Sequence, residues 1–289
     1  MTGIEITQVR KRYKNVTALD DVSLTFEKGK IYGLLGRNAA GKTTLLNIIA
    51  GRIFADGGRV TIDGAPVVEN AAVRDKLFCM SEKDLYIPNM KVRDHFKWTA
   101  RFYDSFDVEK AREMAAAFGL DENKKFQALS KGQQSMFKLI VALALDLPYL
   151  IFDEPVLGLD ANNRARFYRL LLEKYEREAN TLIIATHLIE EVAHLIEEVV
   201  FIDAGRVLLR ANVEELVARG YTVSGNADAV DAYCADKRVL STERLAGLKV
   251  ATVLGARSER AQAPEGLQFA PLGLQQLFVK MTDDKEEPS

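Results

Sequence analysis

The sequence predicts an α/β protein with a parallel sheet covered by helices on both faces, followed by a small appended α+β unit. Two observations predict the sheet. Short apolar strands alternate with helices after residue 130, and a glycine-rich turn at residues 36–41 joins a strand to a helix. A third observation predicts the appended unit: after about Arg219, weak strands surround one helix-like segment. The 289 residues suit one large domain and a smaller one.

The first 80 residues are rich in strands. Residues 3–13 alternate between apolar and polar side chains, residues 22–36 hold two strands around a Lys28-Gly29 turn, and residues 57–67 form a strand between glycine turns. The run that follows the glycine-rich turn has helical spacing. Its side chains expected to pack inward are Leu45, Leu46, Ile48, Ile49 and Ala50.

Helices are expected next, between about residues 91 and 126. Residues 92–103 and 107–120 both carry apolar side chains at helical spacing, and Asp107 is a suitable cap for the second. A helix starting near Gln133 is then followed by an apolar strand at residues 149–155. This order of elements predicts a helical region of about residues 84–130 inserted before the sheet resumes.

The last strands of the large domain follow the same alternation. A helix at residues 161–179 precedes the strand of residues 181–187, and residues 198–210 predict a hairpin around Ala204-Gly205. In the appended unit, weak strands and helix-like segments are expected at residues 221–225, 226–236, 249–256, 267–272 and 273–282. The charged end of the sequence, residues 283–289, is typical of a disordered tail.

Composition excludes several classes of protein. The 39 basic and 41 acidic residues give a net charge of −2, so we expect no nucleic-acid partner. Cys79 and Cys234 form no CxxC pair, which argues against zinc and disulfide frameworks. No apolar run is long enough for a membrane span, and the first residues lack the apolar region of a signal peptide. We therefore expect a cytoplasmic chain.

The glycine-rich turn carries the first functional motif. Gly36, Gly41, Lys42 and Thr43 fit G-x-x-x-x-G-K-[ST], with a predicted strand before and a helix after. Glycine leaves room for backbone N–H groups to converge on phosphate oxygens, and the helix N-terminus adds positive partial charge. Lys42 would reach the outer phosphates and Thr43 would bind Mg²⁺. The alternative is a turn that merely caps a helix. The remaining residues of this predicted nucleotide site are Arg37, Asn38, Ala39, Ala40 and Thr44.

A carboxylate pair ends the buried strand of residues 149–155. Carboxylates are costly there unless they serve a cation or a proton, so Asp153 and Glu154 are candidate functional residues. Asp153 suits a role in holding Mg²⁺, and Glu154 could polarise the water that attacks the terminal phosphate. The alternative is an ordinary surface turn after a strand.

One further segment resembles a known family. The stretch ALSKGQQSMFKLIVALALDLPYLIFDEPVLGLD is similar to the ATP-binding cassette (ABC) family over its whole length. The signature segment, residues 129–133, comprises Leu129, Ser130, Lys131, Gly132 and Gln133 and stands about twenty residues before Asp153. By its position, it predicts a second anion-receptive helix N-terminus, apart from the first.

The resemblance implies a fold and a cofactor. The implied fold is a P-loop NTPase cassette: a RecA-like core with an antiparallel β subdomain and an α-helical subdomain. Residues 1–215 would form this nucleotide-binding domain, 216–280 a small C-terminal α+β domain and 281–289 a disordered tail. The implied activity is hydrolysis of ATP with Mg²⁺. In the family, two cassettes pair head to tail, and the signature of one closes on the γ-phosphate held by the other.

Single positions match the family as well. Tyr13 resembles the aromatic that stacks on adenine, although it could be a tyrosine at a strand edge. Asp160 resembles the key residue of the loop that links the two sites, although it could simply cap the next helix. His187 resembles the switch histidine that contacts the γ-phosphate, in a catalytic set with Lys42 and Glu154. His95 and His194 are expected to be surface or packing residues.

The sequence also departs from the family's pattern at four positions. Glu82 stands where glutamine is usual and would add a carboxylate to the metal site of Thr43 and Asp153. Ala39 and Lys131 stand in place of glycines, and Arg37 replaces a proline. These substitutions bear on the turnover rate more than on the fold.

The leading functional hypothesis is the ATPase subunit of an ABC transporter. The sequence of residues 81–96 and the presence of a C-terminal unit most resemble the ATPases of bacterial exporters of peptide antibiotics and peptide toxins. In those exporters the ATPase is a separate chain at the inner face of the membrane. Its partners would be a second cassette and an integral membrane permease subunit. The aromatic side chains between Asp84 and Tyr103, Trp98 among them, could receive that subunit, but most are expected to form core. A soluble cassette for complex assembly and a regulatory module without hydrolysis are the alternatives.

Overall fold

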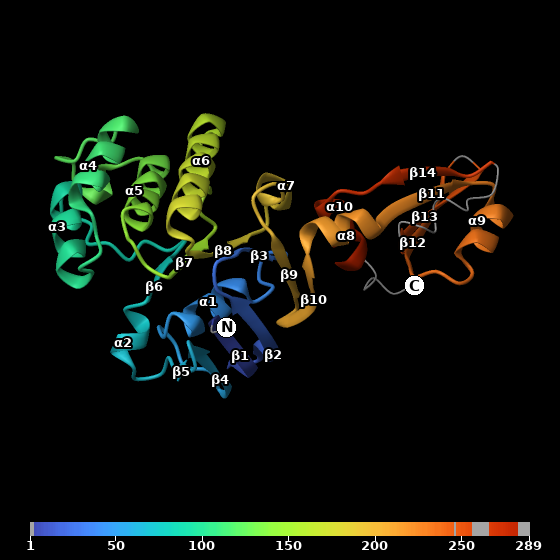
Figure 1. Cartoon of the computed structure of the whole chain (residues 1–289), viewed down its shortest axis with the longest axis horizontal. Helices are drawn as coiled ribbons and strands as arrows, with labels where there is room; N and C mark the ends of the chain where they lie inside the picture. Colours follow the sequence, from blue (N-terminus) through green and yellow to red (C-terminus); the bar gives the residue numbers. More distant parts are fainter. Residues whose placement is uncertain (1–2, 246, 256–265, 283–289) are drawn as a thin grey trace. The chain divides into compact units, whose positions relative to one another are not determined.

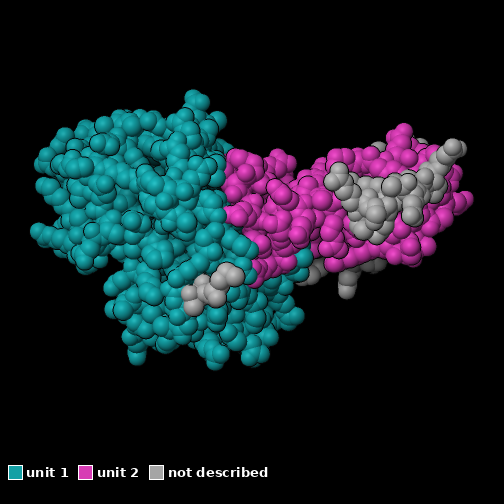
Figure 2. All heavy atoms as spheres, in the orientation of Figure 1, with its two compact units in different colours: residues 1–187, 202–209 teal, residues 188–201, 210–289 magenta. Residues whose placement is uncertain are grey.

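A computed structural model of the protein describes residues 3–245, 247–255 and 266–282. The chain divides into two compact units, coloured separately in Figure 2. The first comprises residues 1–187 and 202–209, and the second comprises residues 188–201 and 210–289. The domain boundaries expected at residues 215 and 280 stay predictions, and the predicted tail of residues 283–289 lies outside the described residues.

An antiparallel sheet forms one part of the first unit (Figure 1). Its strand order is β2-β1-β4-β5, and every pairing is antiparallel. Ile4 of β1 pairs with Phe26 on one side and Ile62 on the other, and all three side chains are fully buried. The bounds are β1 Gly3–Tyr13, β2 Val16–Glu27, β4 Gly57–Ile62 and β5 Ala65–Pro66.

The larger sheet has the strand order β10-β9-β3-β8-β7-β6, and the four strands from β3 to β6 in this order run parallel. Strands β3, β7 and β8 are buried along their whole length, as expected of a sheet covered on both faces. β2 and β3 flank one turn but belong to different sheets. The bounds are β3 Ile31–Leu35, β6 Leu77–Met80, β7 Tyr149–Asp153, β8 Thr181–Thr186, β9 Glu198–Asp203 and β10 Arg206–Asn212.

The longer helices of the first unit confirm the predicted pattern, with one shift, and the short helix α2 was not expected. α5 begins at Lys131 rather than near Gln133, because Ser130 and Gln133 form a capping box that starts the helix earlier. α3, α4 and α5 pack together as the helical region (Figure 1). The bounds are α1 Lys42–Ile49, α2 Ala71–Arg74, α3 Val92–Phe102, α4 Val108–Ala117, α5 Lys131–Leu143 and α6 Ala161–Glu178, with a 3₁₀ turn at Phe126–Ala128.

The C-terminal sheet of the second unit has the order β12-β13-β11-β14 and is antiparallel throughout. Its core joins Tyr221 and Val253 to Val230 and Tyr233 of α9, and the two tyrosine hydroxyls lie 2.9 Å apart. β12 was not expected, because its charged residues hide the alternation. The bounds are α7 Ile189–Val192, α8 Val213–Arg219, β11 Gly220–Gly225, α9 Ala227–Cys234, β12 Val239–Leu245, β13 Leu248–Leu254, β14 Gln268–Pro271 and α10 Leu274–Thr282.

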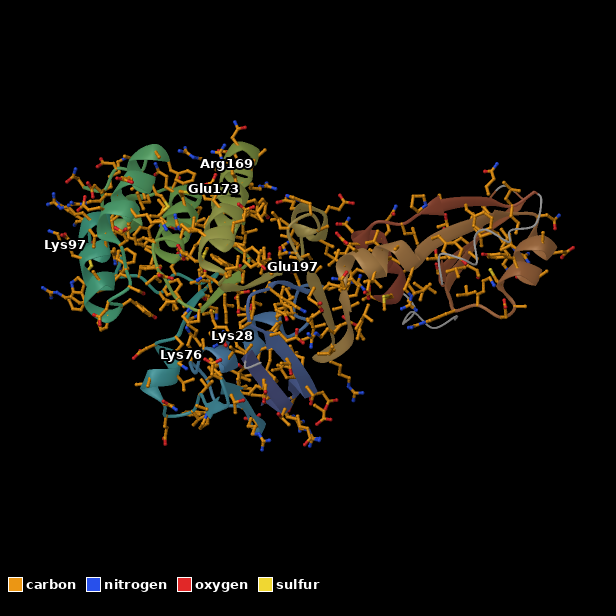
Figure 3. All side chains as sticks on the ribbon, viewed as in Figure 1. Lys28, Lys76, Lys97, Arg169, Glu173 and Glu197 are labelled. Carbon is orange, nitrogen blue, oxygen red and sulfur yellow. The ribbon has the colours of Figure 1, made fainter. Side chains whose placement is uncertain are left out.

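One ionic contact joins the antiparallel sheet to the parallel sheet. Asp63, which follows β4, accepts a hydrogen bond from the Tyr149 hydroxyl at the start of β7 (2.7 Å). The ammonium groups of Lys28 and Lys76, labelled in Figure 3, lie 2.8 and 3.0 Å from its carboxylate oxygens. Burial opposes ionisation of Asp63, but the hydrogen bonds from Lys28, Tyr149 and Lys76 outweigh it and lower the pKa to about 2.

Replacing Asp63 with Asn should therefore destabilise the fold in a pH-dependent manner. Because the folded pKa of about 2 lies below the ordinary 3.8, the stabilisation is present above pH 3.8 and is lost as the pH falls towards 2. We expect Asp63→Asn to lower the free energy of unfolding by about 2 kcal/mol at pH 7. Denaturant unfolding at pH 7 and pH 3 measures this, with the exposed Asp104→Asn as control. A loss that is equal at both pH values would contradict the account.

Candidate active site

The turn between β3 and α1 is shaped by two glycines. A Cβ on Gly36 would lie 2.3 Å from the carbonyl oxygen of Ile202, so no side chain fits there. Gly41 precedes α1 with a φ of 106°, and its Cβ would lie 2.6 Å from the Ala18 oxygen. These two positions let the backbone turn sharply into the helix, as the motif predicts.

The rest of the turn shows how this chain accommodates its departures. Ala39 has a φ of 63°, the left-handed conformation that glycine adopts at less cost. Lys42, in the first turn of α1, is buried, and its Nζ donates to the carbonyl oxygens of Gly36 (2.6 Å) and Arg37 (3.1 Å). The lysine thus holds the loop in a closed curve around its own ammonium group.

The end of β7 places two carboxylates beside this turn. Asp153 is 2% exposed, and its Oδ1 accepts a hydrogen bond from the Thr43 hydroxyl at 3.2 Å. Glu154 follows with a φ of 49°, and its Oε1 lies 3.8 Å from Nζ of Lys42. β7 and α1 therefore bring the predicted lysine, threonine and acidic pair into one cluster.

β8 supplies the third side of the cluster. The Thr186 hydroxyl donates to Oε2 of Glu154 (2.8 Å), and the backbone N–H of His187 donates to Oε1 (3.1 Å). Nδ1 of His187 also lies 2.9 Å from Oε1. Because an ionised carboxylate can only accept, this contact requires the proton on Nδ1. The carboxylate of Glu154 is thus fixed by three donors from the end of one strand.

The cluster holds more carboxylates than cations, and two of them, Asp153 and Glu154, have largely buried side chains. Burial is the largest influence on Asp153, and the carboxylates of Glu154 and Glu82 act in the same direction, so its pKa rises to about 6. Burial lowers the pKa of Lys42, while the carboxylates of Glu154, Asp153 and Glu82 oppose that shift. One buried lysine is thus set against three carboxylates.

A cavity of about 630 Å³, here called the main cavity, opens at this cluster. Tyr13, at the end of β1, is 46% exposed and is not among its lining residues, nor are Gly36, Arg37 and the buried Asp153. Val16, Ala18 and Leu157 line it without having been expected, since apolar side chains give no signal in a sequence. The predicted residues that line it are Asn38, Ala39, Ala40, Gly41, Lys42, Thr43, Thr44, Glu82, Glu154 and His187.

The signature segment is built separately from this cavity. The Ser130 hydroxyl accepts from the N–H of Gln133, and the Gln133 side chain accepts from the N–H of Ser130. A Cβ on Gly132 would lie 2.9 Å from the carbonyl oxygen of Gly158, so this glycine permits close contact with the loop before α6. Asp160 is the N-cap of α6, accepting from the N–H of Asn163 at 2.8 Å. The contacts of Asp160 within this chain are therefore those of a helix cap.

Glu82 lies in an exposed loop after β6. It lines the main cavity and also a second cavity of about 280 Å³, which reaches Lys131 of the signature segment. Glu154 and Leu157 line both cavities as well. Two residues with contacts in this region, Thr186 and Lys138, were not predicted because neither belongs to a motif. Thr186 directly precedes His187, and the one signal for Lys138 was the position of a lysine in an otherwise apolar helix.

Comparison with known proteins identifies the family. The family model described as ABC transporter matches residues 19–157. The chain is 33% identical to the ABC transporter ATP-binding protein NatA of Bacillus subtilis, over 74% of this chain and 91% of the relative. It is 32% identical to the taurine import ATP-binding protein TauB of Pseudomonas entomophila, over 90% of this chain and all of the relative.

The chain belongs to the ABC transporter family. A further relative, the Nod factor export ATP-binding protein I of Burkholderia orbicola, is 28% identical over 96% of both chains. Among solved structures, the dimeric ABC cassette MJ0796 in its post-hydrolysis state superposes with a TM-score of 0.66 at 24% identity, covering 73% of this chain and 98% of the other.

Family membership confirms the predicted cassette fold and the predicted activity. The chain is an ATP-binding subunit of an ABC transporter, and it hydrolyses ATP to energise transport. Its own architecture agrees with the family's: an antiparallel sheet, a mostly parallel sheet and a helical region. In the part of the chain that the structure describes, no helix combines the length and apolar composition needed to span a bilayer.

The raised pKa of Asp153 predicts that this residue lowers the stability of the nucleotide-free protein. The difference between its folded pKa of about 6 and the ordinary 3.8 corresponds to at most about 3 kcal/mol of destabilisation at pH 8. This cost disappears below pH 3.8, where the carboxyl is neutral in both states. Asp153→Asn should therefore raise the melting temperature of the nucleotide-free protein in EDTA at pH 8, and by only about half as much at pH 5. A variant that melts lower than the wild type at pH 8 would show that ionised Asp153 does not destabilise the fold.

Proposed function

We propose that this cassette binds the phosphates of ATP in the main cavity and uses Glu154 as the base for hydrolysis. One observation carries the proposal: Lys42, Glu154 and His187 converge at the wall of a single cavity bordered by the backbone of residues 38–44. The N-terminus of α1 and its N–H groups attract the anion. On binding, Lys42 would exchange the carbonyl oxygens of Gly36 and Arg37 for the outer phosphate oxygens.

The residues at this site also fit Mg²⁺. The described residues contain no cluster of three or more His, Cys, Asp or Glu side chains suited to a metal ion. A metal here would therefore use the Thr43 hydroxyl, the Asp153 carboxylate and the substrate's phosphates, with Glu82 as a further carboxylate, which is how Mg²⁺ is usually held. When bound, it would neutralise charge on the phosphates and on Asp153.

Glu154 and His187 would carry out the chemistry. The Glu154 carboxylate takes a proton from water, whose oxygen attacks the γ-phosphorus as the bond to the β-phosphate oxygen breaks, giving ADP and phosphate. Thr186 and the His187 N–H fix the direction of the carboxylate. His187 is partly exposed at the cavity, which suits contact with the γ-phosphate.

The site would be completed by a second cassette. Ser130 to Gln133 lie at another helix N-terminus, outside the lining of the main cavity, so they suit the nucleotide of a partner chain rather than that of their own. Gly132 of this segment contacts Gly158 in the loop before α6, and Asp160 caps that helix. This loop would therefore follow movements of the signature segment. The dimeric form of the related cassette MJ0796 supports a pairing of this kind.

An exposed apolar groove suits the membrane partner. Among the aromatics of this region Phe96 is fully buried, as expected of core, whereas Trp98 and Phe102 are 44% and 69% exposed and stack on each other with ring centroids 5.8 Å apart. Together with Leu85 and Ile87 they border a cavity of about 420 Å³ in the helical region. We propose that a helix of an integral membrane permease subunit docks here, which would hold the cassette at the cytoplasmic face of the membrane.

Direction and substrate extend the proposal. We propose export, of peptides or antibiotics, on the resemblance of residues 81–96 and of the C-terminal unit to such exporters. The alignment with the Nod factor export protein, which spans 96% of this chain including the C-terminal unit, supports this direction. The alignment with TauB, named for taurine import, is the observation against it.

Replacement of Glu154 by Gln tests the chemical step. Gln keeps the size of the side chain and one acceptor oxygen but cannot take the proton, so we expect kcat for ATP hydrolysis to fall at least about 100-fold while ATP still binds. The trapped ATP should hold two copies together, measurable by sedimentation with Mg·ATP. Lys42→Ala should instead lose ATP affinity. Hydrolysis by Glu154→Gln at the wild-type rate would overturn the assignment of the base.

The apolar groove has its own test. Tagged Glu154→Gln protein, purified with Mg·ATP from solubilised membranes of its host, should retain a multi-span membrane protein in stoichiometric amount, identified by mass spectrometry. Adding Trp98→Ser and Phe102→Ser should remove that partner with little change in melting temperature, because both side chains are exposed. Leu248→Ser, at an exposed apolar position of β13, is the matched control. Recovery of soluble partners alone would contradict the docking of a permease subunit in this groove.

A further inference from the structure

A lysine buried in α5 contacts the loop that carries Glu82. Lys138 is 5% exposed, and the side chains of its neighbours Phe137 and Leu139 are fully buried. From Met136 to Leu143, it is the single ionisable residue of the helix. A buried ammonium group is costly unless every proton finds an acceptor, so its contacts should explain its presence.

All three protons of Lys138 have acceptors in the Glu82 loop, residues 81–84. Nζ lies 2.6 Å from Oδ1 of Asp84, 2.7 Å from the carbonyl oxygen of Glu82 and 3.4 Å from that of Ser81. A lysine ammonium has three donors, so the set is complete. The contact acts on the backbone of Glu82 and leaves its carboxylate free to face the main cavity.

Asp84 extends the contact to the signature segment. Its Oδ2 lies 3.3 Å from Nζ of Lys131. The Asp84 carboxylate therefore forms ion pairs with two lysines of α5, Lys131 at its first position and Lys138 in its middle. Burial opposes ionisation of Asp84, but the hydrogen bonds and charges of Lys138 and Lys131 outweigh it and lower its pKa. The Glu82 loop and α5, here called the signature helix because it begins within the signature segment, are thereby joined by ionic contacts.

The second cavity shows how near this contact lies to the chemistry. Lys138, Asp84 and Lys131 line it together with Glu82 and Glu154, and the last two also line the main cavity. If the contacts of Lys138 were lost, the loop could shift and move Glu82 relative to Asp153 and Glu154. Displacements of about 1 Å at a reacting centre can lower the rate of reaction about 100-fold.

We propose that Lys138 is a positioning residue, which fixes the Glu82 backbone to the signature helix so that the Glu82 carboxylate moves with that helix and is held at the catalytic cluster. The proposal rests on the proposed function of Glu154 and the main cavity. Lys138 does not itself touch the nucleotide. Its role is to make the position of Glu82 depend on the position of α5, and so on the closure of the signature segment over a partner's nucleotide.

The test uses kcat and ATP affinity measured separately on the full chain. Lys138→Met keeps the apolar stem and removes the donors, and we expect kcat to fall at least 10-fold with the Kd for ATP within 2-fold, because the phosphate-binding turn is untouched. Lys138→Arg should restore part of the loss. Lys174→Met is the matched control: Lys174 is equally buried and bonded to Glu178 and the Leu145 carbonyl oxygen, but lies on α6 away from the cavity. It should lower stability and leave kcat unchanged.

A double-mutant cycle separates positioning from general support of the fold. If Lys138 acts through Glu82, Lys138→Met should add less than 2-fold to the loss of kcat already caused by Glu82→Ala. Losses that multiply would overturn the proposal, and so would an unchanged kcat in Lys138→Met. If Lys138→Met does not fold, Asp84→Asn, at an exposed position, replaces it and should also lower kcat. Failure of the proposed function is distinguished by Glu154→Gln: wild-type hydrolysis there would refute the assignment of the base whatever Lys138 does.

Discussion

The site depends on placing three carboxylates beside one buried lysine at the carboxyl end of β7. Asp153 and Glu154 stand at the end of this buried strand, the exposed Glu82 adds a third carboxylate, and Lys42 is the cation among them. A protein selected for stability alone would replace such a cluster with apolar side chains. We propose that the imbalance prepares the site for a substrate that brings its own cation.

The fold supplies those contacts from adjacent parallel strands. The ends of β3, β7 and β8 meet at one edge of the sheet, so the turn after β3, Glu154 after β7 and His187 after β8 line one cavity. The buried Asp153 and Thr186 accept from Thr43 and donate to Glu154, respectively, two residues of that lining. Two non-glycine residues take left-handed backbone conformations there, Ala39 and Glu154, and the surrounding packing offsets the cost. The loop of Glu82 is fixed from the other side by Lys138, which joins the cluster to the signature helix.

Much of this was predictable from sequence because it rests on local rules. The motif around Lys42 and the acid pair after an apolar strand each need specific residue types at fixed spacing. The strand β12 was missed because charged residues mask its alternation, and the exposure of Trp98 and Phe102 depends on which neighbours cover α3. The contacts of Lys138 and Thr186 join residues distant in sequence, so no spacing rule reveals them. Glu82 could be named from its position, but what holds it could not.

The most direct test of the charge account is the thermal stability of the wild-type protein with ATP in the presence and absence of Mg²⁺. Ligands that bind only the folded state stabilise it by RT ln(1 + [L]/Kd), so at a given concentration the tighter ligand gives the higher melting temperature. If the buried carboxylates await a cation, saturating ATP in EDTA should raise the melting temperature slightly and Mg·ATP by several degrees more, because the metal relieves repulsion between the phosphates and the Asp153 cluster. Equal shifts with and without Mg²⁺ would contradict the account.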